Sequence, residues 1–246
     1  MINVKKFLLL AMFAAITTEG NSQLWKLRRL ELSAGAGTSH FMGDVGGYTH
    51  PENYKGFRDI SIFNTGFVYN SNLRYRLTKF VSVRANISGG FFRSSDNWGS
   101  NIGRSYMSST IFFEPVLMGE FYIFKNNMEN RYLFIRGHRT THYPLSDYFD
   151  AYVFGGIGGL NWDITPNANL AFKIKKADGF TLIIPGGIGI SKSLPRNFKT
   201  GVELGGRYVL SDLPEGYSGL GSKKDVYYFL TVNLTWKVRI KESPTF

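Results

Sequence analysis

The residue types that most often carry catalysis are sparse in this sequence, and they do not form pairs. The histidines are His40, His50, His138 and His142. The last two are four residues apart, a spacing that lets two imidazoles bind zinc on a helix, but the surrounding GHRTTHYP carries no helix signal. Because no nucleophile and base can be placed together, we expect no catalytic residues, no metal ligands and no cofactor-binding residues. The sequence therefore predicts a chain that is not an enzyme.

A glycine-rich run, GGIGG at residues 155–159, has the composition of a phosphate-binding loop. A phosphate loop would need a following lysine and a helix, and neither is present. The run instead continues the alternation of a strand, in which glycine permits tight curvature. We therefore interpret residues 151–162 as a curved strand.

The chain is basic and has no cysteine. Its formal net charge is +11 over 246 residues, and it contains 21 Phe and 14 Tyr. No nucleic-acid-binding motif accompanies the positive charge, so we expect acidic lipid head groups or an acidic protein partner rather than nucleic acid. Without cysteine, an exported chain must obtain its rigidity from strand pairing and side-chain packing.

The amino terminus has the pattern of a secretory signal peptide. Lys5 and Lys6 precede the uncharged run FLLLAMFAAI at residues 7–16, and TTEGNSQ follows. A spanning helix needs roughly 20 apolar residues, so this run is too short to stay in a bilayer. We expect residues 1–22 to be a cleaved signal and residues 23–246 to form a single barrel domain.

Strict alternation of apolar and polar residues recurs along the rest of the chain. It is clearest in residues 226–239, where Leu230, Val232 and Leu234 alternate with Thr231 and Asn233. A period of two indicates a strand with two different faces. Eight such strands are expected, at residues 30–38, 63–77, 80–93, 111–124, 151–162, 180–191, 200–210 and 226–239.

The polar faces of these strands decide between a membrane barrel and a soluble one. The charged residues that fall opposite the apolar set are Arg74, Arg76, Arg84, Glu120, Glu203, Arg207, Lys237 and Arg239. An eight-stranded barrel has little interior space, so paired charges inside and bulky apolar groups outside are the simpler packing. Trp162 and Trp236, near strand ends, fit the aromatic girdles of such a barrel. We therefore predict an all-β, eight-stranded, antiparallel up-and-down transmembrane β-barrel. The alternative is a soluble lipocalin-like ligand binder.

Connection lengths predict the orientation in the membrane. The connection at residues 77–80 is minimal, whereas those at 40–62 and 94–104 are long. Outer-membrane barrels have short periplasmic turns and longer outer loops, which puts the short turn and both termini in the periplasm. Residues 125–149 break this rule, because they are long and fall on the periplasmic side. They are either a solvated extension, in which residues 132–135 could pair as an extra strand, or a docking element that uses Arg131, Arg136 and Arg139.

Read in order, several segments resemble a known family. GTSHFMGDVGG at residues 37–47, GGRYVLSDLPEGYS at 205–218 and DVYYFLTVNLTW at 225–236 resemble the PorG-like outer-membrane barrels of the type IX secretion system. The likeness extends over nearly the whole mature chain. Its most specific positions are Gly43, Asp44, Arg207, Asp212 and Gly216. The extension at residues 125–149 is longer than the turn that is usual in that family.

The resemblance implies a non-enzymatic part of a protein secretion and gliding apparatus. Members of the family are thought to link outer-membrane lipid to a periplasmic ring built from a lipoprotein and its soluble partner. The alternation of residues by itself points to no such partner. The alternative is a small outer-membrane barrel of other use, such as a lipid-modifying enzyme or a surface adhesin.

Overall fold

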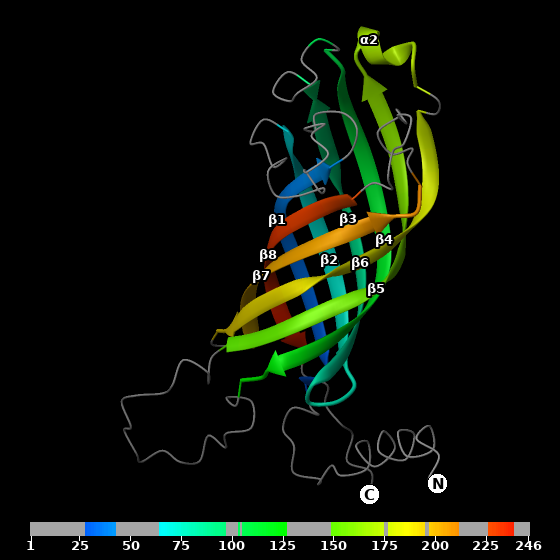
Figure 1. Ribbon diagram of the computed structural model, residues 1–246. Coiled ribbons are helices and arrows are strands. Elements are labelled where there is room, and N and C mark those ends of the chain that lie inside the picture. The colour runs from blue at the N-terminus through cyan, green and yellow to red at the C-terminus, as the bar shows by residue number, and fades with distance from the viewer. Residues whose placement is uncertain are drawn as a thin grey trace, which may run out of the picture.

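The chain folds into a closed antiparallel β-barrel (Figure 1). The computed structural model describes residues 28–42, 64–96, 103, 105–126, 149–174, 177–194, 197–211 and 226–238. The strands in these ranges are β1 (Leu30–Met42), β2 (Thr65–Arg76), β3 (Val81–Ser95), β4 (Met107–Phe124), β5 (Phe149–Pro166), β6 (Asp178–Ser193), β7 (Phe198–Val209) and β8 (Val226–Val238). Each strand pairs with its neighbours in the sequence, and β1 pairs with β8 to close the barrel. The predicted fold class is confirmed.

One short helix, α2 (Ala168–Ala171), follows β5. Figure 1 shows it at one end of the barrel, far from the β2–β3 turn at residues 77–80. The end that carries this turn is called the turn end below, and the other is called the loop end. No helix in the described part of the chain is long and apolar enough to cross a membrane.

Alternation of side chains separates the inside of the barrel from the outside. On β8, Leu230, Val232 and Leu234 are exposed, whereas Thr231 and Asn233 are buried. The other strands repeat this pattern, because successive residues of a strand point to opposite faces. The exposed wall is built from Leu, Ile, Val, Phe and Tyr, so the apolar face looks outward.

The apolar wall has the height of a membrane core. On β6 the outward apolar side chains extend from Phe180 to Ile190, close to the roughly 9–11 residues that one tilted barrel strand needs to cross the hydrocarbon. Level with Phe180 and beyond it, β5 turns Asn161, Asp163 and Thr165 outward. The polar outer surface marks where the barrel leaves the hydrocarbon at the loop end.

Several strands are longer than the sequence predicts, most of all β1, β4, β5 and β6. β4 begins at Met107 rather than at residue 111, and β5 extends to Pro166 rather than to residue 162. Hydrogen bonding between strands continues beyond the membrane, where an apolar outer face is no longer required. The girdle position predicted for Trp162 is wrong, because its side chain is buried inside the barrel, whereas Trp236 lies on the outer wall.

Glycine makes room for the large rings inside the barrel. A Cβ atom at Gly187 would lie 2.6 Å from the Phe154 ring, so only glycine fits beside that ring. The interior therefore holds bulky side chains that the sequence argument had placed outside.

Candidate functional site: the charged barrel interior

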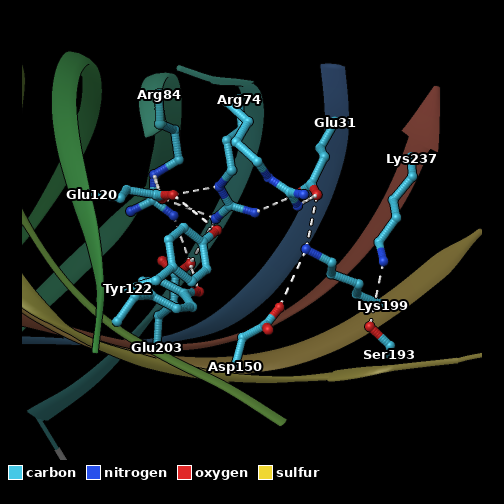
Figure 2. Close-up of polar contacts among 12 residues, drawn as sticks. Glu31, Arg74, Arg84, Glu120, Tyr122, Asp150, Ser193, Lys199, Glu203 and Lys237 are labelled. Atoms are coloured by element: carbon cyan, nitrogen blue, oxygen red, sulfur yellow. Dashed lines mark hydrogen bonds and ion pairs between the residues drawn. The ribbon is translucent and has the colours of Figure 1, made fainter. Parts of the chain in front are cut away.

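The barrel interior is the strongest candidate site, and its two ends differ in chemistry. The turn end holds a network of buried ion pairs (Figure 2). The loop end holds a cluster of aromatic and aliphatic side chains. The cavity between the two has a volume of about 10 Å³, the lower limit for one water molecule. Within the described residues, side chains therefore occupy most of the interior at this level of the barrel.

Glu31 is a junction of the network. Its carboxylate lies 3.0 Å from Arg74 Nη1, 2.8 Å from Arg76 Nη2 and 2.8 Å from Lys199 Nζ. The side chain is fully buried, so these cations replace the hydration that it loses on folding. Because its partners come from β2, which pairs with β1, and from β7, which lies beyond β8, the contacts bind three strands together.

Glu120 and Glu203 extend the network across the barrel. Arg74 Nε lies 2.6 Å from Glu120 Oε2, and Arg84 Nη1 lies 2.6 Å from Glu203 Oε1. Arg84 Nε also contacts Glu120, at 3.1 Å. The Tyr152 hydroxyl donates to Glu203 at 2.6 Å. Two guanidinium groups and two carboxylates therefore share one buried cluster supplied by β2, β3, β4 and β7, with a tyrosine from β5.

Asp150 closes the network at the turn end. It accepts from Lys125 Nζ at 2.9 Å and from the backbone N–H of Asn126 at 2.8 Å. Lys199 Nζ lies 3.4 Å from the same carboxylate. Lys199 therefore connects Asp150 to Glu31, as Figure 2 shows.

A separate polar group lies within the aromatic half. Glu114 accepts from the Tyr227 hydroxyl at 2.5 Å and from Arg207 Nε at 3.3 Å. The guanidinium of Arg207 lies over the Phe229 ring, 4.1 Å from its centroid. A buried carboxylate needs such partners, because an unpaired one would be costly. This group joins β4 to β7 and β8 across the barrel.

Stacked rings fill the rest of the loop end. The Phe92 and Phe112 rings are 4.3 Å apart, and Phe112 and Phe229 are 5.4 Å apart. Phe41 and Tyr227 complete the same cluster. Rings at these distances exclude water and pack at the density of a protein core.

The charged residues singled out from the sequence lie inside the barrel, with their side chains buried. These are Arg74, Arg76, Arg84, Glu120, Glu203, Arg207 and Lys237. The network unites the first five, and Arg207 stands apart with Glu114. Lys237 donates to Ser193 Oγ at 3.4 Å. The positions that lie outside the described residues are Gly43, Asp44, Arg131, Arg136, Arg139, Asp212, Gly216, Arg239 and the expected signal at residues 1–22.

Five charged residues that form these interior contacts escaped the sequence reasoning: Glu31, Glu114, Lys125, Asp150 and Lys199. Glu31 alternates with Leu30 and Leu32 in the expected first strand, so its period-two position could have identified it. Asp150 and Lys199 each precede an expected strand by one residue. Glu114 lies opposite the apolar face of the expected strand at residues 111–124, so its position in that strand could also have identified it.

The interior contacts link strands that are distant in the barrel. Every carboxylate of the network contacts at least one cation in the described structure. No group of three or more His, Cys, Asp or Glu side chains that could hold a metal occurs among the described residues. The arrangement can therefore hold distant strands together and close the barrel.

Comparisons with known proteins find similar barrels. No protein-family model matches the chain, and no curated protein matches it. Neisserial surface protein A is 8% identical with a TM-score of 0.47, over 85% of this chain and 97% of that chain. OprG from Pseudomonas aeruginosa is 10% identical with a TM-score of 0.45, over 85% and 96%. A major outer membrane protein from Thermus thermophilus is 9% identical with a TM-score of 0.46, over 85% and 99%.

These low identities and TM-scores say nothing about function. The surface of the barrel itself is more informative, because its outer wall is apolar to the height of a membrane core and its charges lie inside. This distribution is the one that lipid requires and water does not. The chain is a small eight-stranded outer-membrane β-barrel.

Proposed function

We propose that the chain is a non-enzymatic barrel of a type IX protein secretion and gliding apparatus. In this function it attaches the outer membrane to a periplasmic ring built from a lipoprotein and its soluble partner. Two observations support the proposal: the resemblance of the sequence to PorG-like barrels, and an interior filled by ion pairs and rings. The filled interior carries the argument, because a barrel whose interior is occupied by side chains suits an anchor better than a conduit.

A membrane anchor in a machine must resist deformation. Glu31 ties β1 to β2 and β7 through contacts of 2.8–3.0 Å. Glu114 ties β4 to β7 and β8 at the other end. Such cross-barrel contacts oppose flattening of the barrel when a partner pulls on one side.

The orientation that we propose puts the turn end in the periplasm. The β2–β3 turn is short, and short turns of outer-membrane barrels are periplasmic. β4 ends at Phe124 and β5 begins at Phe149, both at the turn end. The residues between them therefore leave and re-enter the barrel on the side of the proposed ring. We propose that Arg131, Arg136 and Arg139 dock the partner there by charge complementarity.

Replacing residues 127–147 with a short Gly-Ser turn tests this role. The barrel should stay folded, as judged by a gel mobility that changes on boiling. Recovery of periplasmic partners from crosslinked envelopes should fall, and secretion of cargo should fall with it. The matched control shortens residues 51–62, which connect β1 to β2 at the loop end, and should leave both readouts unchanged. Normal partner recovery and normal secretion with the short turn would refute the docking role.

A further inference from the structure

The lipid-facing wall of the barrel contains one marked groove. It has a volume of about 580 Å³ and crosses β7, β8, β1, β2 and β3. Its floor is made of small outward residues, Ala34, Ser71 and Ala85. Its sides are made of large ones: Leu32, Leu73, Ile87, Phe198, Leu234 and Trp236. The concavity is centred on β1 and its neighbours.

The groove leads toward a basic rim at the turn end. Arg28 and Arg29 directly precede β1, and both are partly exposed. Leu32, which lines the groove, is the third residue of that strand. The backbone N–H of Arg76 donates to the Arg29 carbonyl at 2.9 Å, which holds this rim against the end of β2. Cations therefore lie at the membrane surface next to an apolar groove that lies within the hydrocarbon.

Trp236 marks the same boundary. It lines the groove near the end of β8, and 48% of its surface is exposed. Tryptophan prefers the level of lipid head groups, where its ring meets acyl chains and its N–H meets polar groups. The groove is thus apolar within the membrane and has a tryptophan at the interface. Arg28 and Arg29 lie beyond it, at the turn end.

We propose that this groove is a binding site for an anionic phospholipid. One acyl chain lies over Ala34, Ser71 and Ala85, between the large side chains. The phosphate and acidic head group lie beside Arg28 and Arg29. A juxtamembrane cation attracts an acidic head group at the surface, and the groove adds contact with the chain that a flat wall cannot give. In the proposed orientation this lipid belongs to the periplasmic leaflet.

The charge at the rim favours a lipid over a second copy of the barrel. A symmetric dimer through this face would bring two sets of Arg28 and Arg29 near each other, which is repulsive at the low dielectric of the interface. An anionic lipid is attracted to the same residues. The inference depends on the placement in a membrane and not on the role in secretion, so a failed partner experiment would leave it intact.

Quenching of Trp236 by brominated lipids tests the site. The full chain is used with Trp25→Phe and Trp98→Phe, which leaves Trp162 inside the barrel and Trp236 in the groove. It is reconstituted into vesicles that mix phosphatidylcholine with brominated phosphatidylglycerol, and the converse mixture is measured in parallel. A further Trp236→Phe variant supplies the residual signal of Trp162. The relative binding constant should favour phosphatidylglycerol by about fivefold or more at low salt.

Matched variants separate a built site from general attraction to the surface. Arg28→Gln with Arg29→Gln should reduce the preference to near one, and Arg28→Gln alone should lower it in part. Lys192→Gln removes an exposed charge at the same end of the barrel on β6, and it should leave the preference unchanged. Ala34→Leu fills the groove and should weaken the preference, whereas Ala151→Leu on β5 should not. A gel mobility that changes on boiling checks that each variant is folded.

Three results would overturn the proposal. Equal quenching by both lipids in the parent chain would show that the groove does not select the head group. An equal loss of preference in the Lys192 and arginine variants would reduce the effect to bulk surface charge. Absence of quenching of Trp236 by either lipid would mean that protein, such as a second copy, covers the groove.

Discussion

At the scale of single residues, Glu31 contacts three cations, more than any other carboxylate of the described interior contacts. Arg74, Arg76 and Lys199 all lie within 3.0 Å of it, and its side chain has no access to solvent. Removing one member of a buried ion pair leaves the partner charge buried and uncompensated. Here the loss of a single carboxylate would remove one partner from each of three buried cations, although Arg74 keeps Glu120 and Lys199 keeps Asp150.

We therefore predict that Glu31→Gln lowers the free energy of unfolding by about 3–5 kcal/mol. The measurement is urea unfolding in lipid vesicles, followed by intrinsic fluorescence. The control is Lys192→Gln, which removes an exposed charge and should change stability by less than about 1 kcal/mol. A Glu31 variant as stable as the control would mean that the network adds nothing to stability.

The sequence made half of this network predictable. Arg74, Arg76, Arg84, Glu120 and Glu203 could be assigned to the interior because each alternates with large apolar neighbours. Their pairing could not be predicted, because Glu31 and Lys199 are brought together only by the closure of β1 on β8 and of β8 on β7. Alternation gives the face that a side chain occupies, whereas the partner depends on the register of strands distant in sequence.

At the scale of elements, the outer face of each strand changes from apolar to polar where the barrel leaves the membrane. Val232 on β8 lies among exposed apolar residues, whereas Asn161 on β5 lies at the edge of the apolar wall beside Phe180, with Asp163 and Thr165 beyond it. Charge on the lipid face is costly near the middle of the membrane and much less costly near its surface. The same substitution at these two positions should therefore have different effects.

Val232→Arg should cost about 2–4 kcal/mol of folding free energy in vesicles, and Asn161→Arg should cost about 0–1 kcal/mol. Both side chains point outward, so neither change disturbs the ion pairs. Refolding yield and unfolding midpoints in vesicles of one lipid composition give the comparison. Equal costs at the two positions would place the membrane boundary elsewhere on the barrel.

The same change of the outer face from apolar to polar explains why some strand ends were not predicted from the sequence. β1 to β8 were all expected, because apolar alternation is strong within the membrane. The first residues of β4 and the last of β5 were missed, because their outer face is no longer apolar. The girdle position of Trp162 was wrong in this same region. Asn161 and Asp163 face outward there, so the tryptophan between them faces the interior.

At the scale of the whole molecule, the barrel interior holds two layers of different chemistry. Ion pairs fill the turn end and stacked rings fill the loop end, with a cavity of only about 10 Å³ between them. An eight-stranded barrel is narrow enough for side chains to fill it completely. The aromatic layer was not predicted from the sequence. Glycines such as Gly187 make room for large rings, but which ring lies beside which glycine depends on the pairing of the strands.

A filled barrel should not conduct ions. We predict no steady conductance when the folded chain is inserted in planar bilayers at neutral pH, and no swelling of vesicles in a small solute. Insertion and folding are checked on the same vesicles by the change of gel mobility on boiling. An open porin at equal protein-to-lipid ratio provides the positive control. Stepwise conductance from the folded chain would show that a path exists through the ion pairs and rings, and it would remove the main support for an anchoring role.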